Sequence, residues 1–228
     1  MTTTTPPHPA KFSPSILAKV KSIVAEEARF HEGLYRVFDP FAGVGGIHEL
    51  ESINPTVRTL GFELEKEWAD AHPFTLHANA LHISKYWPEG NVFDAIVTSP
   101  CYGNRMADHH DARDDSIRNT YRHKLGRPLS LDSSAGLQWG DEYRSFHADV
   151  WYQCVDVLRS NGIFVLNCKD HIRKSEIQHV TDWHIQTLES LGLIIERSHW
   201  IDAPGNRMGQ NGEKRIDHET ITVLRKTA

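Results

Sequence analysis

The residues best equipped for chemistry are Ser99, Pro100, Cys101 and Tyr102, which follow the apolar run AIVT. A strand that ends at a proline leaves its last side chains at the edge of a sheet, where ligands bind in α/β folds. The Ser99 hydroxyl and the Pro100 carbonyl are hydrogen-bond acceptors, and the Tyr102 ring can stack on a planar group. Two interpretations are open: a positioning site built from Ser99, Pro100 and Tyr102, or a site in which the Cys101 thiol is a nucleophile.

A glycine turn, VFDPFAGVGG at residues 37–46, is the second segment of interest. Gly43 and Gly45 allow the backbone to turn tightly and to approach a ligand. Asp39, at the end of the preceding apolar run, would repel a pyrophosphate and would favour a cation such as an amino acid ammonium. The turn also departs from the G-x-G-x-x-G pattern of dinucleotide sites.

Two more polar residues end the next two predicted strands. Glu63 suits a carboxylate that accepts hydrogen bonds from two ribose hydroxyls, and Asn79 suits an amide that reads an adenine edge. Taken singly, they also fit a solvated glutamate and a turn residue. Together with Asp39 they place polar groups at three successive strand ends, which favours one shared site.

Strand-like and helix-like segments alternate along the chain, which predicts an α/β fold with a mostly parallel sheet covered by helices on both faces. The predicted helices are residues 13–30, 45–52, 65–72, 142–160 and 180–192, with Ser13 and Thr181 as N-caps. The predicted strands are residues 34–39, 57–64, 74–81, 92–99, 163–168, 193–201 and 218–224. No helix separates the last two strands, so we expect them to pair antiparallel.

The composition limits the class of protein. The 228 residues suffice for one large domain, which we expect at residues 10–228 after a flexible, proline-rich tail at residues 1–9. No apolar run reaches the length of a membrane span, and three cysteines without C-x-x-C spacing suit a reducing, cytoplasmic setting. The net charge of −5 is not that of a typical nucleic-acid binder, although a local basic face would suffice.

A long polar segment at about residues 103–143 is expected to be a substrate loop with some helix of its own. Basic and aromatic residues in this and two later loops are candidates for phosphate contact and base stacking. They are Arg105, Arg118, Tyr121, Arg122, Lys124, Trp139, Lys169, Arg173, Arg207 and Arg215. The alternative is a solvated, charge-balanced loop. The run HHDARDD suggests a metal site, but adjacent side chains point apart, so we expect no metal.

DPFAGVGG resembles the cofactor motif of S-adenosylmethionine-dependent methyltransferases, and TSPCY resembles the catalytic motif of DNA amino-methyltransferases. Residues 8–24 resemble the segment of that family that closes over the methionine end of the cofactor. Over most of its length the chain also resembles small phage-type DNA methylases, which implies the cytoplasm of a bacterial or phage-infected cell. The resemblance implies a Rossmann-like class I methyltransferase fold, a seven-stranded sheet with the last strand inserted antiparallel.

The resemblance also assigns roles. It implies cofactor contacts from Phe12, Ser13, Asp39, Pro40, Phe41, Gly43, Gly45, Glu63, Leu64, Asn79, Ala80 and Ser99. The reaction implied is methyl transfer to an exocyclic amine of a flipped-out or single-stranded DNA base, with N4 of cytosine favoured slightly over N6 of adenine. Ser99 and the Pro100 carbonyl would take the amine hydrogens, and Tyr102 would stack on the base.

Three alternatives stay open. Cys101 replaces the second proline of the family motif, and a Pro-Cys pair also resembles the nucleophile of cytosine C5-methyltransferases. Those enzymes follow the pair with glutamine, where Tyr102 stands, and place a Glu-Asn-Val where no glutamate precedes Asn167. A second alternative is that the substrate is RNA. A third is that the chain binds S-adenosylmethionine without turnover. The oligomeric state, monomer or homodimer, is not predicted.

Overall fold

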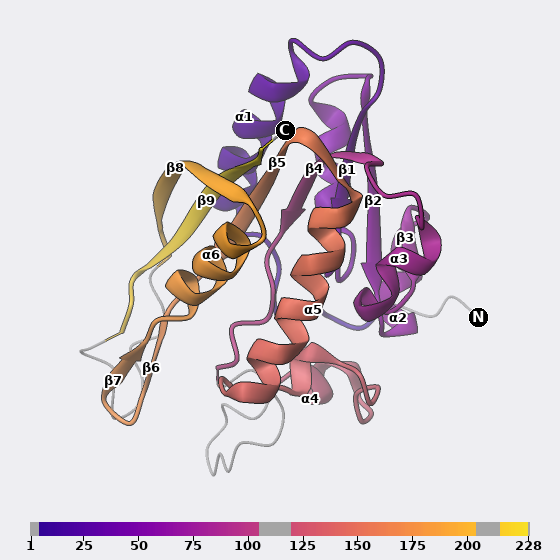
Figure 1. The fold of residues 1–228 in the computed structure, drawn as a ribbon. Coiled ribbons are helices and arrows are strands. Elements are labelled where there is room, and N and C mark those ends of the chain that lie inside the picture. Colours follow the sequence, from indigo (N-terminus) through magenta and orange to yellow (C-terminus); the bar gives the residue numbers. More distant parts are fainter. Residues whose placement is uncertain (1–4, 105–119, 204–214, 228) are drawn as a thin grey trace.

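Seven strands form one sheet in the order β3-β2-β1-β4-β5-β9-β8 (Figure 1). The computed structural model describes residues 5–104, 120–203 and 215–227. The strands of the sheet are β1 (Tyr35–Asp39), β2 (Val57–Glu63), β3 (Thr75–His77), β4 (Phe93–Thr98), β5 (Leu158–Cys168), β8 (Leu193–Asp202) and β9 (His218–Lys226). The strands from β3 to β5 pair in parallel, whereas β9 is antiparallel to both β5 and β8. The predicted sheet with the last strand inserted antiparallel is confirmed.

Helices cover both faces of this sheet. They are α1 (Pro14–Ala28), η1 (Gly46–Ser52), α2 (Lys66–Ala69), η2 (Ala80–His82), α3 (Ile83–Tyr86), α4 (Tyr121–Leu125), η4 (Ser134–Gly136), α5 (Asp141–Val157) and α6 (Val180–Ser190). Side chains of α3, α5 and α6 pack in one apolar cluster, and those of α1 and η1 pack in a second. Adjacent residues of one strand, such as Val37 and Phe38, join different clusters because side chains alternate across a strand.

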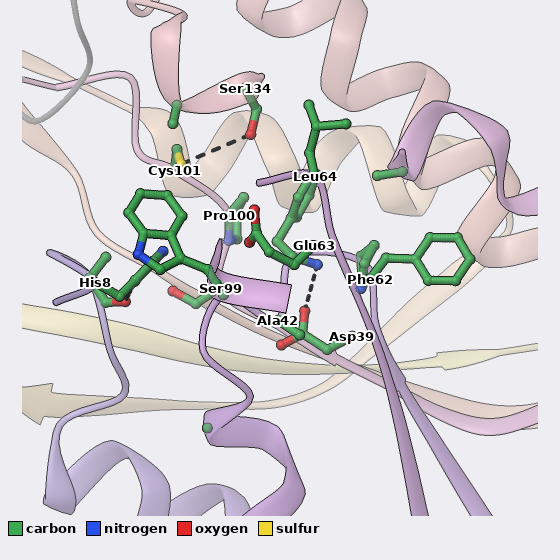
Figure 2. A pocket seen from close by; sticks show the side chains of 18 of the residues that line it. His8, Asp39, Ala42, Phe62, Glu63, Leu64, Ser99, Pro100, Cys101 and Ser134 are labelled. Atoms are coloured by element: carbon green, nitrogen blue, oxygen red, sulfur yellow. Dashed lines mark hydrogen bonds between the residues drawn. The ribbon is translucent and has the colours of Figure 1, made fainter. Parts of the chain in front are cut away.

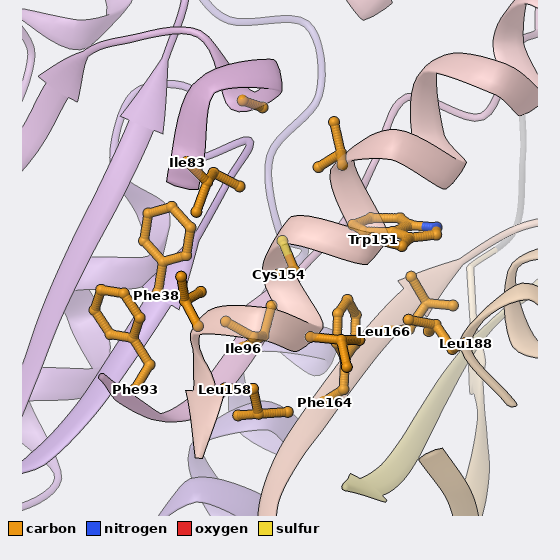
Figure 3. Packing of buried hydrophobic residues seen from close by; sticks show 14 of the residues in the cluster. Phe38, Ile83, Phe93, Ile96, Trp151, Cys154, Leu158, Phe164, Leu166 and Leu188 are labelled. Atoms are coloured by element: carbon orange, nitrogen blue, oxygen red, sulfur yellow. The ribbon is translucent and has the colours of Figure 1, made fainter. Parts of the chain in front are cut away.

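The larger cluster fills the space between the sheet and the helices on one of its faces (Figure 3). Phe38, Ile96 and Phe164 come from the three central strands, and Trp151 of α5 packs against Phe164 at 5.3 Å between ring centroids. All four side chains are fully buried, and each contributes roughly 1.5–3 kcal/mol through the removal of its apolar surface from water. The strand ends that carry the polar residues are therefore fixed in position.

Some predicted elements differ in the structure. The helix expected at residues 65–72 is the single turn α2, and the one expected at residues 45–52 is the 3-10 helix η1. Thr181 is not the N-cap of α6. The helix begins at Val180, its N-cap position is His179, and the Thr181 amide donates to Asp170. The expected loop after β5 contains a small hairpin of β6 (His171–Arg173) and β7 (Glu176–Gln178).

The first helix follows its prediction closely. Ser13 is the N-cap of α1 and accepts a hydrogen bond from the Ile16 amide, and Pro14 is the first helical residue. Within the described ranges, no helix is long and apolar enough to cross a bilayer.

Candidate functional site

A cavity of about 370 Å³ opens at the carboxyl ends of β1, β2 and β4 (Figure 2). The segment from His8 to Phe12 forms another part of its wall. The predicted site residues that line the cavity are Phe12, Asp39, Pro40, Phe41, Gly43, Glu63, Leu64, Asn79, Ala80, Ser99, Pro100, Cys101, Tyr102 and Tyr121. The fold therefore brings the two sequence motifs, more than fifty residues apart, to one site.

Asp39 ends β1 and is almost completely buried, at 2% exposed. Its Oδ1 atom accepts hydrogen bonds from the Phe41 amide at 2.9 Å and from the Thr98 hydroxyl at 2.7 Å. Burial raises the pKa of Asp39 to about 7, and these two donors oppose the rise. Among the described residues Oδ2 has no hydrogen-bond partner, so the carboxylate can accept a bond from a ligand cation.

Glu63, at the end of β2, is the second carboxylate of the cavity. Its Oε1 atom accepts a hydrogen bond from the Glu65 amide at 2.7 Å. Burial raises the pKa of Glu63 to about 7, and the neighbouring Glu65 carboxylate adds to the rise. Hydrogen-bond donors such as the hydroxyls of a diol would stabilise the charged form of this carboxylate and so oppose the rise of its pKa.

In the glycine turn, Gly43 and Gly45 each require glycine for a different reason. Gly43 has φ +54°, and a Cβ there would lie 3.1 Å from the His8 ring, so the turn lets the N-terminal segment close over it. Gly45 has φ +83°, and a Cβ there would meet His48 at 2.7 Å and His72 at 2.8 Å. Gly45 does not line the cavity and shapes the turn instead.

His8, expected in a flexible tail, is packed within the cavity wall. Its ring makes edge contacts with Trp68 at 4.5 Å and Tyr121 at 5.7 Å between centroids. Burial lowers the pKa of His8 to about 4, so the imidazole is neutral at pH 7. No sequence pattern predicts this contact, because a histidine near the N-terminus has no periodic pattern around it.

Ser13 and Asn79 hold local structure. Ser13 does not line the cavity, because its hydroxyl caps α1. Asn79 lines the cavity, but its Oδ1 caps η2 at the Leu81 amide and its Nδ2 donates to Asp132 at 2.9 Å. The amide of Asn79 is therefore already paired within the protein.

The Cys101 thiol faces residues other than the Ser99 hydroxyl. It donates to the Tyr121 hydroxyl at 3.3 Å, and the Ser134 hydroxyl lies 3.9 Å from the sulfur, in the direction seen in Figure 2. Burial raises the pKa of Cys101 to about 11. A thiol nucleophile reacts as the thiolate, which this environment disfavours.

Four polar side chains meet near the Ser99 hydroxyl: two from the segment that follows β4, one from β5 and one from β9. The Ser99 hydroxyl lies 3.0 Å from the Tyr102 hydroxyl, and Tyr102 donates to the Glu219 carboxylate at 3.0 Å. Asn167 of β5 donates through Nδ2 to Ser99 at 3.2 Å, to Tyr102 at 3.1 Å and to Glu219 at 2.7 Å. The Asn167 Oδ1 atom is buried without a partner among the described residues.

The sequence reasoning missed Glu219 as a site residue. It lies in β9, 117 residues beyond Tyr102, and reaches the site because β9 pairs with β5 beside Asn167. The available signal was the two-residue spacing of Glu219, Ile221 and Val223, which places all three side chains on one face of the strand. The side chains of Ile221 and Val223 are buried on that face. The sequence singles out Asn167 only through the comparison with the Glu-Asn-Val motif of cytosine C5-methyltransferases.

Several predicted nucleic-acid contacts are internal instead. The Tyr121 ring is 5% exposed and packs against Trp68, so it is not available for stacking at the surface. The Trp139 ring packs against Tyr143, and the guanidinium of Arg144 lies over it at 5.1 Å. Tyr121 belongs to a small apolar cluster with Trp68, Leu125 and Ala135, whereas Trp139 packs against the large cluster.

Two cations of the same loops are also engaged within the protein. Arg127 forms ion pairs with Glu65 at 2.9 Å and Glu67 at 2.6 Å, which fixes the segment after α4 to α2. Lys169 donates to the Ala203 carbonyl at 2.7 Å, and burial lowers its pKa. Neither side chain points freely toward a phosphate.

The remaining predicted contacts divide into two groups. Arg122 and Arg173 are exposed, and Lys124 and Arg215 are partly exposed. Arg105, Arg118, Arg207 and the run HHDARDD lie outside the described residues. Within the described residues, no group of three or more histidine, cysteine, aspartate or glutamate side chains is arranged to hold a metal ion.

No family model and no curated protein matches the chain. A SAM dependent methyltransferase from Archaeoglobus fulgidus superposes with a TM-score of 0.52 at 12% identity, over 92% of this chain and 94% of that chain. The 1,6-didemethyltoxoflavin-N1-methyltransferase of Burkholderia thailandensis, which has S-adenosylhomocysteine bound, gives 0.53 at 12% identity over 94% and 80%. TrmN from Thermus thermophilus gives 0.52 at 14% over 93% of this chain, which spans only 48% of TrmN. The chain therefore has the Rossmann-like fold of class I S-adenosylmethionine-dependent methyltransferases.

Proposed function

We propose that this chain binds S-adenosylmethionine and transfers its methyl group to an exocyclic amine of a DNA base. When bound, the cofactor supplies an electrophilic methyl group on a sulfonium. The observation that carries the proposal is the presence in one cavity of two carboxylates, the buried Asp39 and the partly buried Glu63, together with a cluster of amine acceptors.

The carboxylates fit the cofactor's donors. The free Oδ2 of Asp39 suits an ammonium, and Glu63, one strand further along the sheet, suits the hydroxyls of a ribose. A Cβ at Gly43 would lie 3.1 Å from the His8 ring, a tight contact, so glycine there lets the N-terminal segment pack close to the turn in the cavity wall. The relative from Burkholderia thailandensis holds S-adenosylhomocysteine in the same fold.

The acceptors fit an amine with two hydrogens. Ser99 and Pro100 line the cavity, and Ser99 Oγ and the Pro100 carbonyl are its two candidate acceptors. An exocyclic amine is a poor nucleophile because its lone pair is delocalised into the base ring. Two acceptors that take its hydrogens favour a pyramidal nitrogen and direct the lone pair toward the methyl group, so positioning supplies most of the catalysis. The raised pKa of Cys101 gives the covalent alternative no such support.

DNA is the proposed acceptor, with N4 of cytosine favoured slightly over N6 of adenine on the strength of the Ser-Pro-x-Tyr motif. A base in a duplex would have to be flipped into the cavity before its amine is free. The exposed or partly exposed Arg122, Lys124, Arg173 and Arg215 are the described side chains proposed to contact phosphates.

Product analysis tests this proposal. The protein is incubated with labelled S-adenosylmethionine and unmodified DNA or RNA, and the nucleosides are identified by mass spectrometry. Methylated N4-cytosine or N6-adenine in DNA is expected. A 5-methylcytosine product, transfer to RNA alone, or cofactor binding without any transfer would each refute it.

The matched variants separate a failed site from a failed fold. Glu63→Gln removes a cavity carboxylate, whereas Glu89→Gln changes an exposed glutamate before β4, at the opposite edge of the sheet. Weaker cofactor binding in the first variant and unchanged binding in the second are expected by calorimetry.

A further inference from the structure

Glu219 has no role in the function proposed above, although it is the only carboxylate among the described residues that contacts the Ser-Pro-Cys-Tyr motif. It is partly exposed at the start of β9 and lines the same cavity as Ser99. Asp39 and Glu63 lie at the ends of β1 and β2, and neither hydrogen bonds to Ser99 or Tyr102. The charge nearest to the proposed amine site therefore comes from the end of the chain.

The directions of the hydrogen bonds follow from counting hydrogens. A tyrosine hydroxyl has one hydrogen, and Tyr102 donates it to Glu219 Oε2 because an ionised carboxylate only accepts. In the contact of 3.0 Å between Ser99 and Tyr102, Ser99 must then be the donor. The lone pairs of Ser99 Oγ are left to accept, one of them facing the Asn167 amide.

Burial raises the pKa of Tyr102 well above its usual value, and the neighbouring Glu219 carboxylate raises it further. The phenol therefore keeps its proton between turnovers and remains a donor to Glu219. Asn167 also donates to Glu219 at 2.7 Å, which holds the carboxylate in place. The arrangement is one chain of hydrogen bonds from Ser99 through Tyr102 to Glu219.

We propose that Glu219 is the terminal proton acceptor of a relay through Tyr102 and Ser99 that takes a proton from the methylated amine. This inference rests on the proposed function. The bond from nitrogen to the methyl carbon forms as the bond from that carbon to sulfur breaks, and the electron pair of the broken bond stays on sulfur. The amine proton passes to Ser99 Oγ, the Ser99 proton to Tyr102, and the Tyr102 proton to Glu219.

The relay leaves Ser99 and Tyr102 neutral and Glu219 protonated, so protons and charges balance. Glu219 is partly exposed and can return the proton to solvent. A serine motif thereby obtains a negative charge that it does not carry itself. Glu219 acts through other residues and is a positioning residue for proton transfer.

Glu219→Gln tests the relay, because glutamine keeps the size and an acceptor oxygen but removes the charge. At saturating cofactor and substrate we expect kcat to fall by about 10-fold to 100-fold, in the range of acid–base contributions. The KM for DNA and the cofactor Kd should change by less than about twofold. Asp217→Asn, an exposed carboxylate two residues earlier, is the control for general charge effects and should keep its kcat.

A double-variant cycle isolates the connection with Ser99. Once Ser99→Ala has removed the entry to the relay, adding Glu219→Gln should lower kcat by less than about twofold more. Melting temperatures provide a readout without turnover: the losses in Tyr102→Phe and Glu219→Ala should be less than additive, because each removes one partner of the same hydrogen bond.

The outcomes separate the two proposals. If the unchanged protein transfers no methyl to DNA, the proposed function fails and the relay fails with it. If it does transfer methyl, a kcat within about twofold in Glu219→Gln, or losses with Ser99→Ala that simply multiply, overturns the relay alone. A large, non-additive loss with unchanged cofactor affinity supports it.

Discussion

Acidification should weaken cofactor binding through the two carboxylates that line the cavity. Burial raises the pKa of both Asp39 and Glu63 to about 7 in the ligand-free protein. The proposed ammonium and ribose contacts need the ionised forms, so a bound cofactor should lower both pKa values. Binding then releases protons near neutral pH, and the affinity must rise with pH in this range.

The magnitude follows from the ionised fractions. A group with a pKa of about 7 is about one half ionised at pH 7 and about one tenth ionised at pH 6. The ionised fraction scales the apparent Kd, so one carboxylate weakens binding about fivefold and two weaken it about thirtyfold over this step. Fivefold corresponds to about 1 kcal/mol. The cofactor's amino group stays protonated at both values, because its pKa lies near 8.

Isothermal titration calorimetry at pH 6 and pH 7, in buffers of different ionisation enthalpy, measures both the Kd and the protons released. Asp39→Asn and Glu63→Gln should each remove about one fivefold step from the pH dependence. His8 does not contribute in this window, because its pKa of about 4 keeps it neutral. A Kd that is the same at both pH values, with no proton release, would show that these carboxylates do not receive the cofactor.

Three further predictions concern other parts of the site. Cys101→Ala should keep its kcat within about threefold, measured by methyl transfer, because the thiol bonds to Tyr121 rather than to Ser99; inactivity with an intact fold would restore the covalent mechanism. Gly45→Ala should lower the free energy of unfolding by about 3 kcal/mol in urea titrations, since it adds a left-handed residue and a clash; a loss below about 1 kcal/mol would contradict this. Arg127→Ala should destabilise by about 3 kcal/mol, because it removes a partner of the buried Glu65, while Lys66→Ala, which breaks an exposed ion pair, should cost under about 1 kcal/mol. Equal losses in these two variants would refute the argument.

The fold could be predicted from the sequence because its signals are local. Each central strand is a short apolar run that ends at Asp39, Glu63 or Ser99, and each is followed by a turn or helix signal. The rule that the carboxyl ends of parallel strands share an edge then placed these three side chains in one site. The short helices were less predictable, because single turns such as α2 have too few residues for a periodic pattern.

The roles of the loop residues could not be predicted in this way. Tyr121 and Trp139 had the composition of a base-stacking surface, but the structure packs both rings against other aromatic side chains. Lys169 was a candidate phosphate contact by residue type, yet it donates to the Ala203 carbonyl at 2.7 Å. Residue type alone does not tell whether an aromatic or basic side chain faces solvent or a neighbour, because the neighbour is distant in the sequence.

The sequence by itself determined the order of strands and helices and the motif residues at the strand ends, since both depend on contacts within a few residues. Tertiary structure alone decided which groups meet those motifs. It folded His8 over Gly43, turned the Cys101 thiol toward Tyr121, and brought Glu219 to Tyr102. The antiparallel insertion of β9 beside β5 is the physical reason for the last contact, because it places the first residues of β9 at the edge where β4 and β5 end.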